Sequence, residues 1–153
     1  MAVPFFMLYN LPMKNLLLLL IIGVILFGCA TTPIPTDQAS LVPQEQILDN
    51  RYLTQEPGTG EVVIKKDSGI KTGITCASRV WIDGVPIVDI RSAEKIILYL
   101  PEGDHIFSAG TSGIGLCTFG TPVETTGSIK IGKLLTIRIG LNGGNLFIAP
   151  TAF

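Results

Sequence analysis

The chain has 153 residues and a formal net charge of −1, with 17 glycines and 10 prolines. Because phosphate recognition needs clustered lysine and arginine, this near-neutral charge excludes nucleic acid as the expected partner. The length indicates one domain with an additional segment, and the glycine and proline content favours many turns over long helices.

The chain begins with an apolar stretch whose uninterrupted part covers residues 16–27. About 12 apolar residues fit the central region of a secretory signal peptide, whereas a membrane-spanning helix needs roughly 20. We therefore predict a signal peptide over residues 1–28. Lys14 precedes the apolar core as a minimal positive region, and Met13 directly before it is an alternative translation start. A single transmembrane anchor over residues 5–27 is the competing interpretation, which Lys14 inside that stretch disfavours.

A short motif, Leu26-Phe27-Gly28-Cys29, stands directly behind the apolar core. It resembles the lipobox of bacterial lipoproteins, in which a small residue precedes the cysteine that becomes acylated. The resemblance implies a thioether between diacylglycerol and the Cys29 sulfur, cleavage before Cys29, and acyl chains of the palmitate class. Two or more such chains hold a protein firmly on a membrane. Ala30 stands where an aspartate would favour the inner membrane, so the resemblance implies an outer-membrane lipoprotein facing the periplasm, with surface exposure left open.

Residues 29–59 form the predicted lipidated N-terminus and a linker that contains Pro33, Pro35, Pro43 and Pro57. A flexible coil of about 30 residues spans on the order of 30 Å. We expect this linker to hold the following domain clear of the lipid headgroups.

Residues 60–153 carry the pattern of an all-β domain. Short runs of β-branched and aromatic residues alternate with turn residues about every 8 to 12 positions, which is typical of a sandwich or small barrel. We predict a small antiparallel β-sandwich of about seven or eight short strands. Three hairpins are expected over residues 78–90, 95–110 and 128–141, and a last strand over residues 142–150.

Alternation along these strands assigns their faces. A two-residue turn at Asp83-Gly84 pairs Ile82 with Val85 and Val80 with Ile87. Alternate residues of two later strands complete the predicted core, which is Val80, Ile82, Val85, Ile87, Ile96, Leu98, Leu100, Leu135, Ile137, Ile139 and Leu141.

The opposite faces of the predicted strands hold further apolar side chains, namely Trp81, Pro86, Val88, Ile90, Ile97 and Tyr99. So many apolar residues do not suit a fully solvated face. Two interpretations remain open: the linker or a loop covers this surface, or it forms a partner-binding patch around Trp81 and Tyr99. The expected partner is another envelope protein or the cell wall.

Two turn motifs within residues 79–109 carry a second resemblance. They read Val80-Trp81-Ile82-Asp83-Gly84 and Leu100-Pro101-Glu102-Gly103-Asp104-His105. This part of the chain is similar to the PEGA-type domain of bacterial envelope proteins. The resemblance implies a β-sandwich and no catalytic residues.

The chain has 3 cysteines. With Cys29 carrying lipid, Cys76 and Cys117 remain as an even pair in an oxidising compartment, which predicts a disulfide between them. Two buried free thiols are the alternative. One histidine and two distant cysteines do not supply a tetrahedral metal site, so we expect no metal and no cofactor.

No pattern of catalytic residues stands out. His105 is the only histidine, and no serine or cysteine is placed beside it by spacing as a nucleophile. We predict a non-catalytic, lipid-anchored envelope protein whose β-sandwich is a binding or structural module. The alternative is an inhibitor or immunity-like protein against an enzyme that attacks the envelope, with the glycine-rich stretch 108–121 as an inserting loop. A hydrolase ranks below both.

Overall fold

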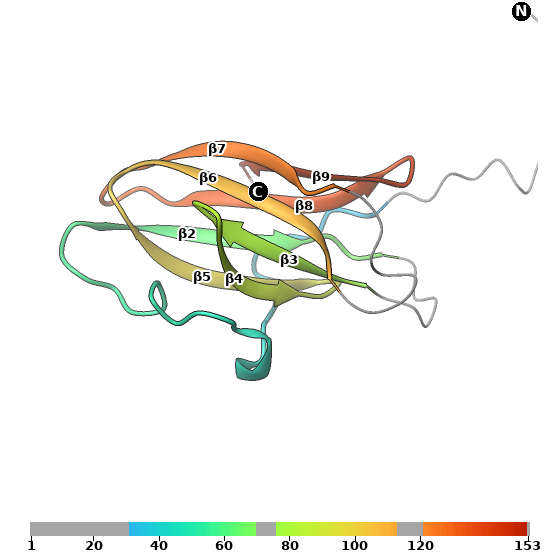
Figure 1. Ribbon diagram of the computed structural model, residues 1–153, viewed down its shortest axis with the longest axis horizontal. Coiled ribbons are helices and arrows are strands. Elements are labelled where there is room, and N and C mark those ends of the chain that lie inside the picture. Colours follow the sequence, from blue (N-terminus) through green and yellow to red (C-terminus); the bar gives the residue numbers. More distant parts are fainter. Residues whose placement is uncertain (1–30, 70–75, 113–120, 153) are drawn as a thin grey trace, which may run out of the picture.

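The computed structural model describes residues 31–69, 76–112 and 121–152. Within these ranges, nine strands and one short 3-10 turn form two sheets that pack face to face (Figure 1). The elements are β1 (Ser40–Leu41), η2 (Gln44–Gln46), β2 (Thr59–Lys66), β3 (Ala77–Ile82), β4 (Val85–Ile90), β5 (Glu94–Pro101), β6 (Gly103–Ser112), β7 (Val123–Ile129), β8 (Leu135–Asn142) and β9 (Asn145–Thr151). The predicted all-β sandwich is confirmed. The predicted signal peptide lies outside the described residues.

The two sheets differ in composition and in strand direction. One has five strands in the order β1-β5-β2-β8-β9, and the other has four in the order β4-β3-β6-β7. The four-stranded sheet is antiparallel throughout, whereas β1 runs parallel to β5, and β2 runs parallel to β8. The sandwich is therefore antiparallel in one layer and mixed in the other. No helix in the described part of the chain combines the length and apolarity needed to span a bilayer.

The core lies between the sheets and follows the expected alternation. Side chains of both sheets that are fully buried include Val62, Val80, Leu98, Phe107 and Ile137. Because successive strand residues point to opposite faces, their neighbours point outward. Of the predicted core, Val85 and Leu135 are partly buried and pack against the cluster of buried residues. Leu141 is half-buried near the end of β8 and lies outside that cluster.

The β3–β4 hairpin has the expected turn but not the expected register. Asp83 and Gly84 have φ values of 50° and 79°, the positive values that a type I′ turn requires. Ile82 pairs with Val85 as predicted, but Val80 pairs with Val88, because the register shifts by one residue beside Trp81.

This bulge corrects the predicted outer face of β4. An extra residue on one strand reverses which side chains point inward beyond it. Val88 and Ile90, which the uninterrupted register places outward, are fully buried. Trp81 and Pro86 pair opposite each other and keep their predicted outward positions.

Two of the three expected hairpins are instead corners between sheets. β5 belongs to the five-stranded sheet and β6 to the four-stranded sheet, and the same split separates β8 from β7. The chain therefore crosses the sandwich at Glu102 and again between Ile129 and Leu135. A tight turn does not distinguish a hairpin from a corner, because both need the same turn residues.

Residues 31–58 do not form the free tether expected from their prolines. β1 adds to the edge of β5, and Ala39 is buried. Farther along, the backbone N–H of Leu48 donates to Ile87 O at 2.8 Å, and that of Tyr99 donates to Tyr52 O at 2.8 Å. This segment therefore covers the exposed edges of β4 and β5, which would otherwise present unpaired backbone groups.

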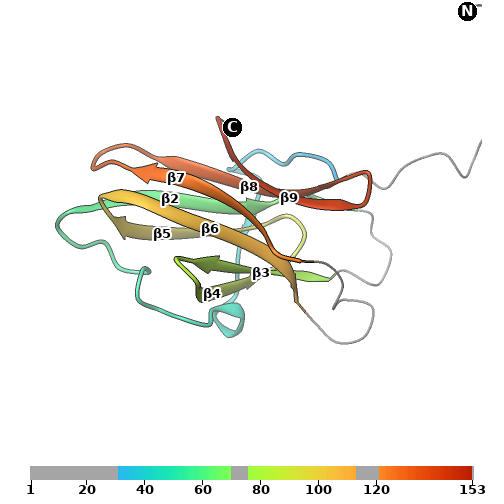
Figure 2. The ribbon, with the colours of Figure 1, turned by 45° about the horizontal axis from the view of Figure 1, so that its top comes forward.

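The sandwich has two distinct ends. Residues 31–37, which we call the strap, meet the sandwich at the end that holds the β8–β9 turn, and we call this the strap end. The β5–β6 and β7–β8 corners lie at the opposite end, the far end, in both views (Figures 1 and 2). The Asp83-Gly84 turn also lies at the far end, because it pairs across to Ile106 at the start of β6.

Candidate functional site

The strap begins with a cluster of buried polar groups at the end of β2. Asp67 is fully buried, and its carboxylate accepts two hydrogen bonds from Arg138, from Nε and from Nη2, both at 2.7 Å. The Thr31 hydroxyl donates to the same carboxylate at 3.0 Å. A buried carboxylate needs such partners, because an unpaired charge in the interior is strongly destabilising. The cluster therefore ties the start of the strap to β2 and β8.

The neighbours of Arg138 shape this cluster. The hydrogen bonds from Arg138 to Asp67 raise the pKa of the guanidinium, with burial opposing them. The guanidinium also lies 5.1 Å from the centre of the Phe147 ring, a cation–π distance. A side chain at Gly140 would collide with Asp67 and come within 2.8 Å of the Phe147 ring. Glycine at this position therefore makes room for the ion pair.

Two lysines bind the backbone of the strap. Lys65 Nζ donates to Ile34 O at 2.7 Å, and Lys95 Nζ donates to Thr36 O at 2.6 Å. The Lys65 side chain is fully buried, and this burial lowers its pKa while the charge of Asp67 opposes the shift. Each ammonium satisfies a carbonyl that would otherwise lie unpaired against the sheet.

A third lysine points the other way, into the sandwich. Lys66 Nζ donates to Cys76 O at 2.7 Å. Burial lowers the pKa of this ammonium from 10.5 to about 8, and the charge of Glu94 opposes the shift. Lys66 therefore stabilises the entry to β3 at the expense of a buried charge.

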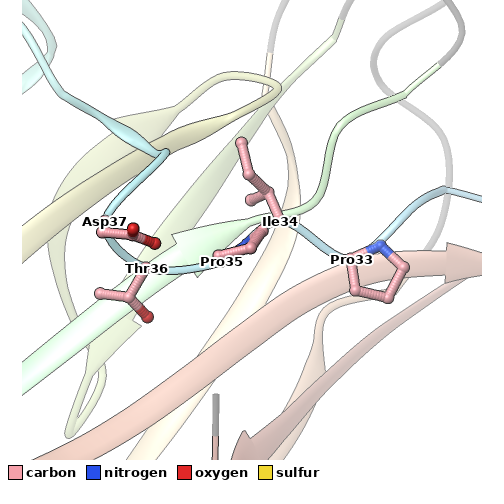
Figure 3. A pocket seen from close by; sticks show the side chains of 5 residues that line it. All are labelled: Pro33, Ile34, Pro35, Thr36 and Asp37. Atoms are coloured by element: carbon pink, nitrogen blue, oxygen red, sulfur yellow. The ribbon is translucent and has the colours of Figure 1, made fainter.

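The strap has a hollow on its surface, of about 460 Å³. Figure 3 shows its five lining residues, which follow one another where the strap crosses β2: Pro33, Ile34, Pro35, Thr36 and Asp37. The lining is mainly apolar and has one carboxylate, that of Asp37. The charge of Asp37 acts on Lys65, whose ammonium binds the Ile34 carbonyl of the same stretch.

The predicted patch residues Trp81 and Tyr99 lie on different faces of the molecule. Trp81 points outward from β3 of the four-stranded sheet, and Tyr99 points outward from β5 of the five-stranded sheet, since the neighbours of each are buried. The structure therefore does not join them into one patch. On the four-stranded sheet, Trp81 is half-buried and Ile106 is 47% exposed.

The two interpretations of the outer apolar faces apply to different sheets. The strap lies over the five-stranded sheet, where Val63 is 3% exposed and Lys65 is fully buried. In the described part of the chain, no segment hydrogen-bonds across the outer face of the four-stranded sheet. That face also carries the Arg79–Asp89 ion pair at 2.8 Å and the Ser108–Glu124 hydrogen bond at 2.9 Å.

His105 holds two turns together at the far end. Its Nδ1 lies 2.7 Å from Asp83 Oδ2, and its Nε2 lies 3.0 Å from Pro101 O. Asp83 also accepts from the backbone N–H of Ile106 at 2.9 Å. Burial acts to raise the pKa of Asp83, but the hydrogen bonds from Ile106 and His105 outweigh it, and the net shift is downward. Both ring nitrogens thus face structural partners rather than a substrate cleft.

The predicted cysteine sites are only partly within the described residues. Cys76 precedes β3 and is disulfide-bonded. Cys29 and Cys117 lie outside the described residues, so lipidation at Cys29 and the Cys76–Cys117 pairing stay predictions, as does the inserting role of the glycine-rich stretch. Among the residues that the structure describes, no group of three His, Cys, Asp or Glu side chains is placed to hold a metal ion.

The strap cluster of Thr31, Asp67 and Arg138 was missed by the sequence interpretation. A signal was present: Lys65, Lys66 and Asp67 continue an apolar strand with three successive charges. At least one of them has to point toward a buried face, because successive side chains alternate. In comparisons with known proteins, no family model, no curated protein and no solved structure matches this chain.

Proposed function

We propose that this protein is a lipid-anchored protein of the bacterial cell envelope, with a non-catalytic β-sandwich that serves as a binding or structural module. The sequence carries the proposal: Leu26-Phe27-Gly28-Cys29, which resembles a lipobox, stands directly behind an apolar core of about 12 residues, the length of a signal-peptide core. The all-β sandwich with its own hydrophobic core agrees with a folded module behind such an anchor.

The chemistry of the described side chains supports the non-catalytic part of the proposal. His105 is hydrogen-bonded on both ring nitrogens, and the most buried charges, Asp67 and Lys65, hold the strap. A buried or perturbed ionisable group can indicate a catalytic site. Here each of these three groups makes a contact that holds the fold together. The resemblance of residues 79–109 to a PEGA-type domain agrees with the same proposal.

The outer face of the four-stranded sheet is the surface that we propose for binding. It exposes Ile106 and carries the half-buried Trp81, whose ring lies against Gly110. Arg79 and Asp89 form an ion pair on this face, and Glu124 accepts a hydrogen bond from Ser108. Aromatic residues and exposed aliphatic residues are frequent at the centre of protein interfaces. The expected partner is an envelope protein or the cell wall.

Metabolic labelling with an alkyne fatty acid tests the anchor. We expect the wild-type protein to take up the label and sediment with membranes, and Cys29→Ala to lose both properties. An unlabelled wild-type protein would refute the proposal. For the binding face, a photo-crosslinking residue at Ile106 should capture a partner in intact cells, whereas one at Leu134, which is 57% exposed at the far end, should not. Equal capture at both positions would argue against this face.

A further inference from the structure

The strap is locked to the sandwich from its first described residue. The backbone N–H of Thr31 donates to Leu141 O at 3.1 Å, and the backbone N–H of Leu141 donates to Thr31 Oγ1 at 2.8 Å. Thr32 and Ser68 exchange two further backbone hydrogen bonds, at 2.8 and 3.0 Å. With the Asp67 carboxylate, these contacts fix the position of Thr31 relative to the strap end.

The distance from this fixed point to the predicted lipid is short. Only Ala30 lies between Cys29 and Thr31, so these residues are two steps apart along the chain. A fully extended chain covers at most about 7 Å over two steps. A free coil over residues 29–59 would allow on the order of 30 Å. The chain between lipid and domain is therefore too short to let the domain tumble away from the membrane.

We infer that the strap end of the sandwich lies against the lipid headgroups and that the far end points away from the membrane. The inference rests on the proposed lipid anchor and names the surface that this anchor brings to the bilayer. In the described part of the chain, that surface includes the β8–β9 turn, the start of the strap with Ser68, and the β4–β5 connection at Arg91.

The charges of the two ends favour the same orientation. Among the described residues, the strap end exposes Arg91, the carboxylate of Asp37 in the strap, and the uncharged turn of Asn142, Gly143, Gly144 and Asn145. The far end exposes four carboxylates, those of Glu56, Asp83, Glu102 and Asp104, against the two lysines Lys130 and Lys133. Bilayers that contain anionic lipid repel an acidic surface and attract basic side chains. The less acidic strap end is thus the better match for headgroups.

Paramagnetic broadening in an NMR spectrum tests the orientation on the acylated full-length mature protein. The protein is placed in bicelles of phosphatidylcholine and phosphatidylglycerol, doped with a lipid that carries a gadolinium chelate on its headgroup. β8 has 8 residues, so its two ends are about 25 Å apart at the usual rise per residue. We expect the amides of Ser68, Asn142 and Asn145 to broaden at least about tenfold more than those of Gly84 and Gly132, given that separation.

A matched variant carries 12 added Gly and Ser residues between Ala30 and Thr31. The insertion leaves every described contact in place and lengthens the link by about 19 Å on average. We expect the ratio of amide broadening between the strap end and the far end to fall below about twofold once the link is flexible. A contrast that persists in this variant would overturn the claim that the short link sets the orientation.

Mass spectrometry on the same samples separates the two proposals. An acylated N-terminal cysteine combined with equal broadening at both ends overturns the orientation and leaves the lipid anchor standing. A chain without acyl groups overturns the anchor itself, and the orientation with it. Selective broadening of the wild type that disappears on insertion supports both.

Discussion

Replacing Asp67 by asparagine is the sharpest perturbation of the strap. The substitution keeps the size of the side chain but removes the charge that faces Arg138 and accepts from Thr31. The arginine is then left with its charge uncompensated in a partly buried site. The change therefore tests whether the ion pair holds the strap or merely lies beside it.

The burial of the ion pair sets how much free energy of unfolding Asp67→Asn should lose. Breaking a fully buried ion pair by removing one partner costs about 3–5 kcal/mol. The side chain of Arg138 is 22% exposed while that of Asp67 is fully buried, so water offsets part of the loss, and we expect about 2–3 kcal/mol. For a domain of this size that loss lowers the melting temperature by roughly 8–12 °C.

Asp89→Asn is the matched control. The Arg79–Asp89 pair has the same two-hydrogen-bond geometry as the Arg138–Asp67 pair but is more exposed to water. Arg79 donates to Asp89 through Nε and Nη2, both at 2.8 Å, but its side chain is 37% exposed. Exposed ion pairs contribute about 0.2–1 kcal/mol, so the control should lose less than about 1 kcal/mol.

The assay is urea unfolding followed by the fluorescence of Trp81, the single tryptophan of the chain. It uses residues 29–153 with Cys29→Ser, exported to an oxidising compartment so that the disulfide forms. If Asp67→Asn and Asp89→Asn lose the same free energy of unfolding within about 0.5 kcal/mol, the buried pair does not hold the strap and the reasoning is refuted.

Three further outcomes follow from single positions. Gly127→Ala should lower the free energy of unfolding by about 1–3 kcal/mol, because the new Cβ would lie 2.9 Å from the buried Phe107 ring and 2.6 Å from Leu135. The control Thr126→Ala, at the exposed neighbouring residue, should change it by less than about 0.5 kcal/mol in the same urea assay. The lowered pKa of Lys66 means that the unfolded chain binds more protons between about pH 8 and pH 10.5, so stability should rise with pH across this window. Between about pH 7 and pH 9.5 the wild type should gain about 2 kcal/mol relative to Lys66→Met, and equal slopes would count against the buried charge. Loss of the predicted Cys76–Cys117 disulfide in the double serine variant should cost about 4 kcal/mol for a loop of 117 − 76 = 41 residues; rapid alkylation of both thiols in unreduced, denatured protein would contradict the pairing.

Much of the sandwich was predictable because its signals are local. The pair Asp83-Gly84 requires the positive φ values that the turn shows. The alternation in β8 placed Ile137 and Ile139 in the core, where both are fully buried. Such patterns need only the period of a strand and the chemistry of a turn.

The remaining features depend on contacts between distant segments. The bulge in the β3–β4 hairpin adds one residue without changing local composition, so alternation alone predicts that Val88 and Ile90 face outward. The corners at Glu102 and at Gly132 have the same turn residues as hairpins. The strap contains two prolines and resembles a linker, yet its carbonyls are bound by Lys65 and Lys95, which lie 31 and 59 residues away from their partners. Long-range pairing of this kind leaves no periodic signal in a single sequence.

The mass of the mature protein isolated from membranes tests the central claim most directly. The account predicts a chain whose first residue is Cys29, with a diacylglyceryl group on its sulfur. A chain that still carries residues before Cys29, or one that begins at Cys29 with an unmodified thiol, would contradict it.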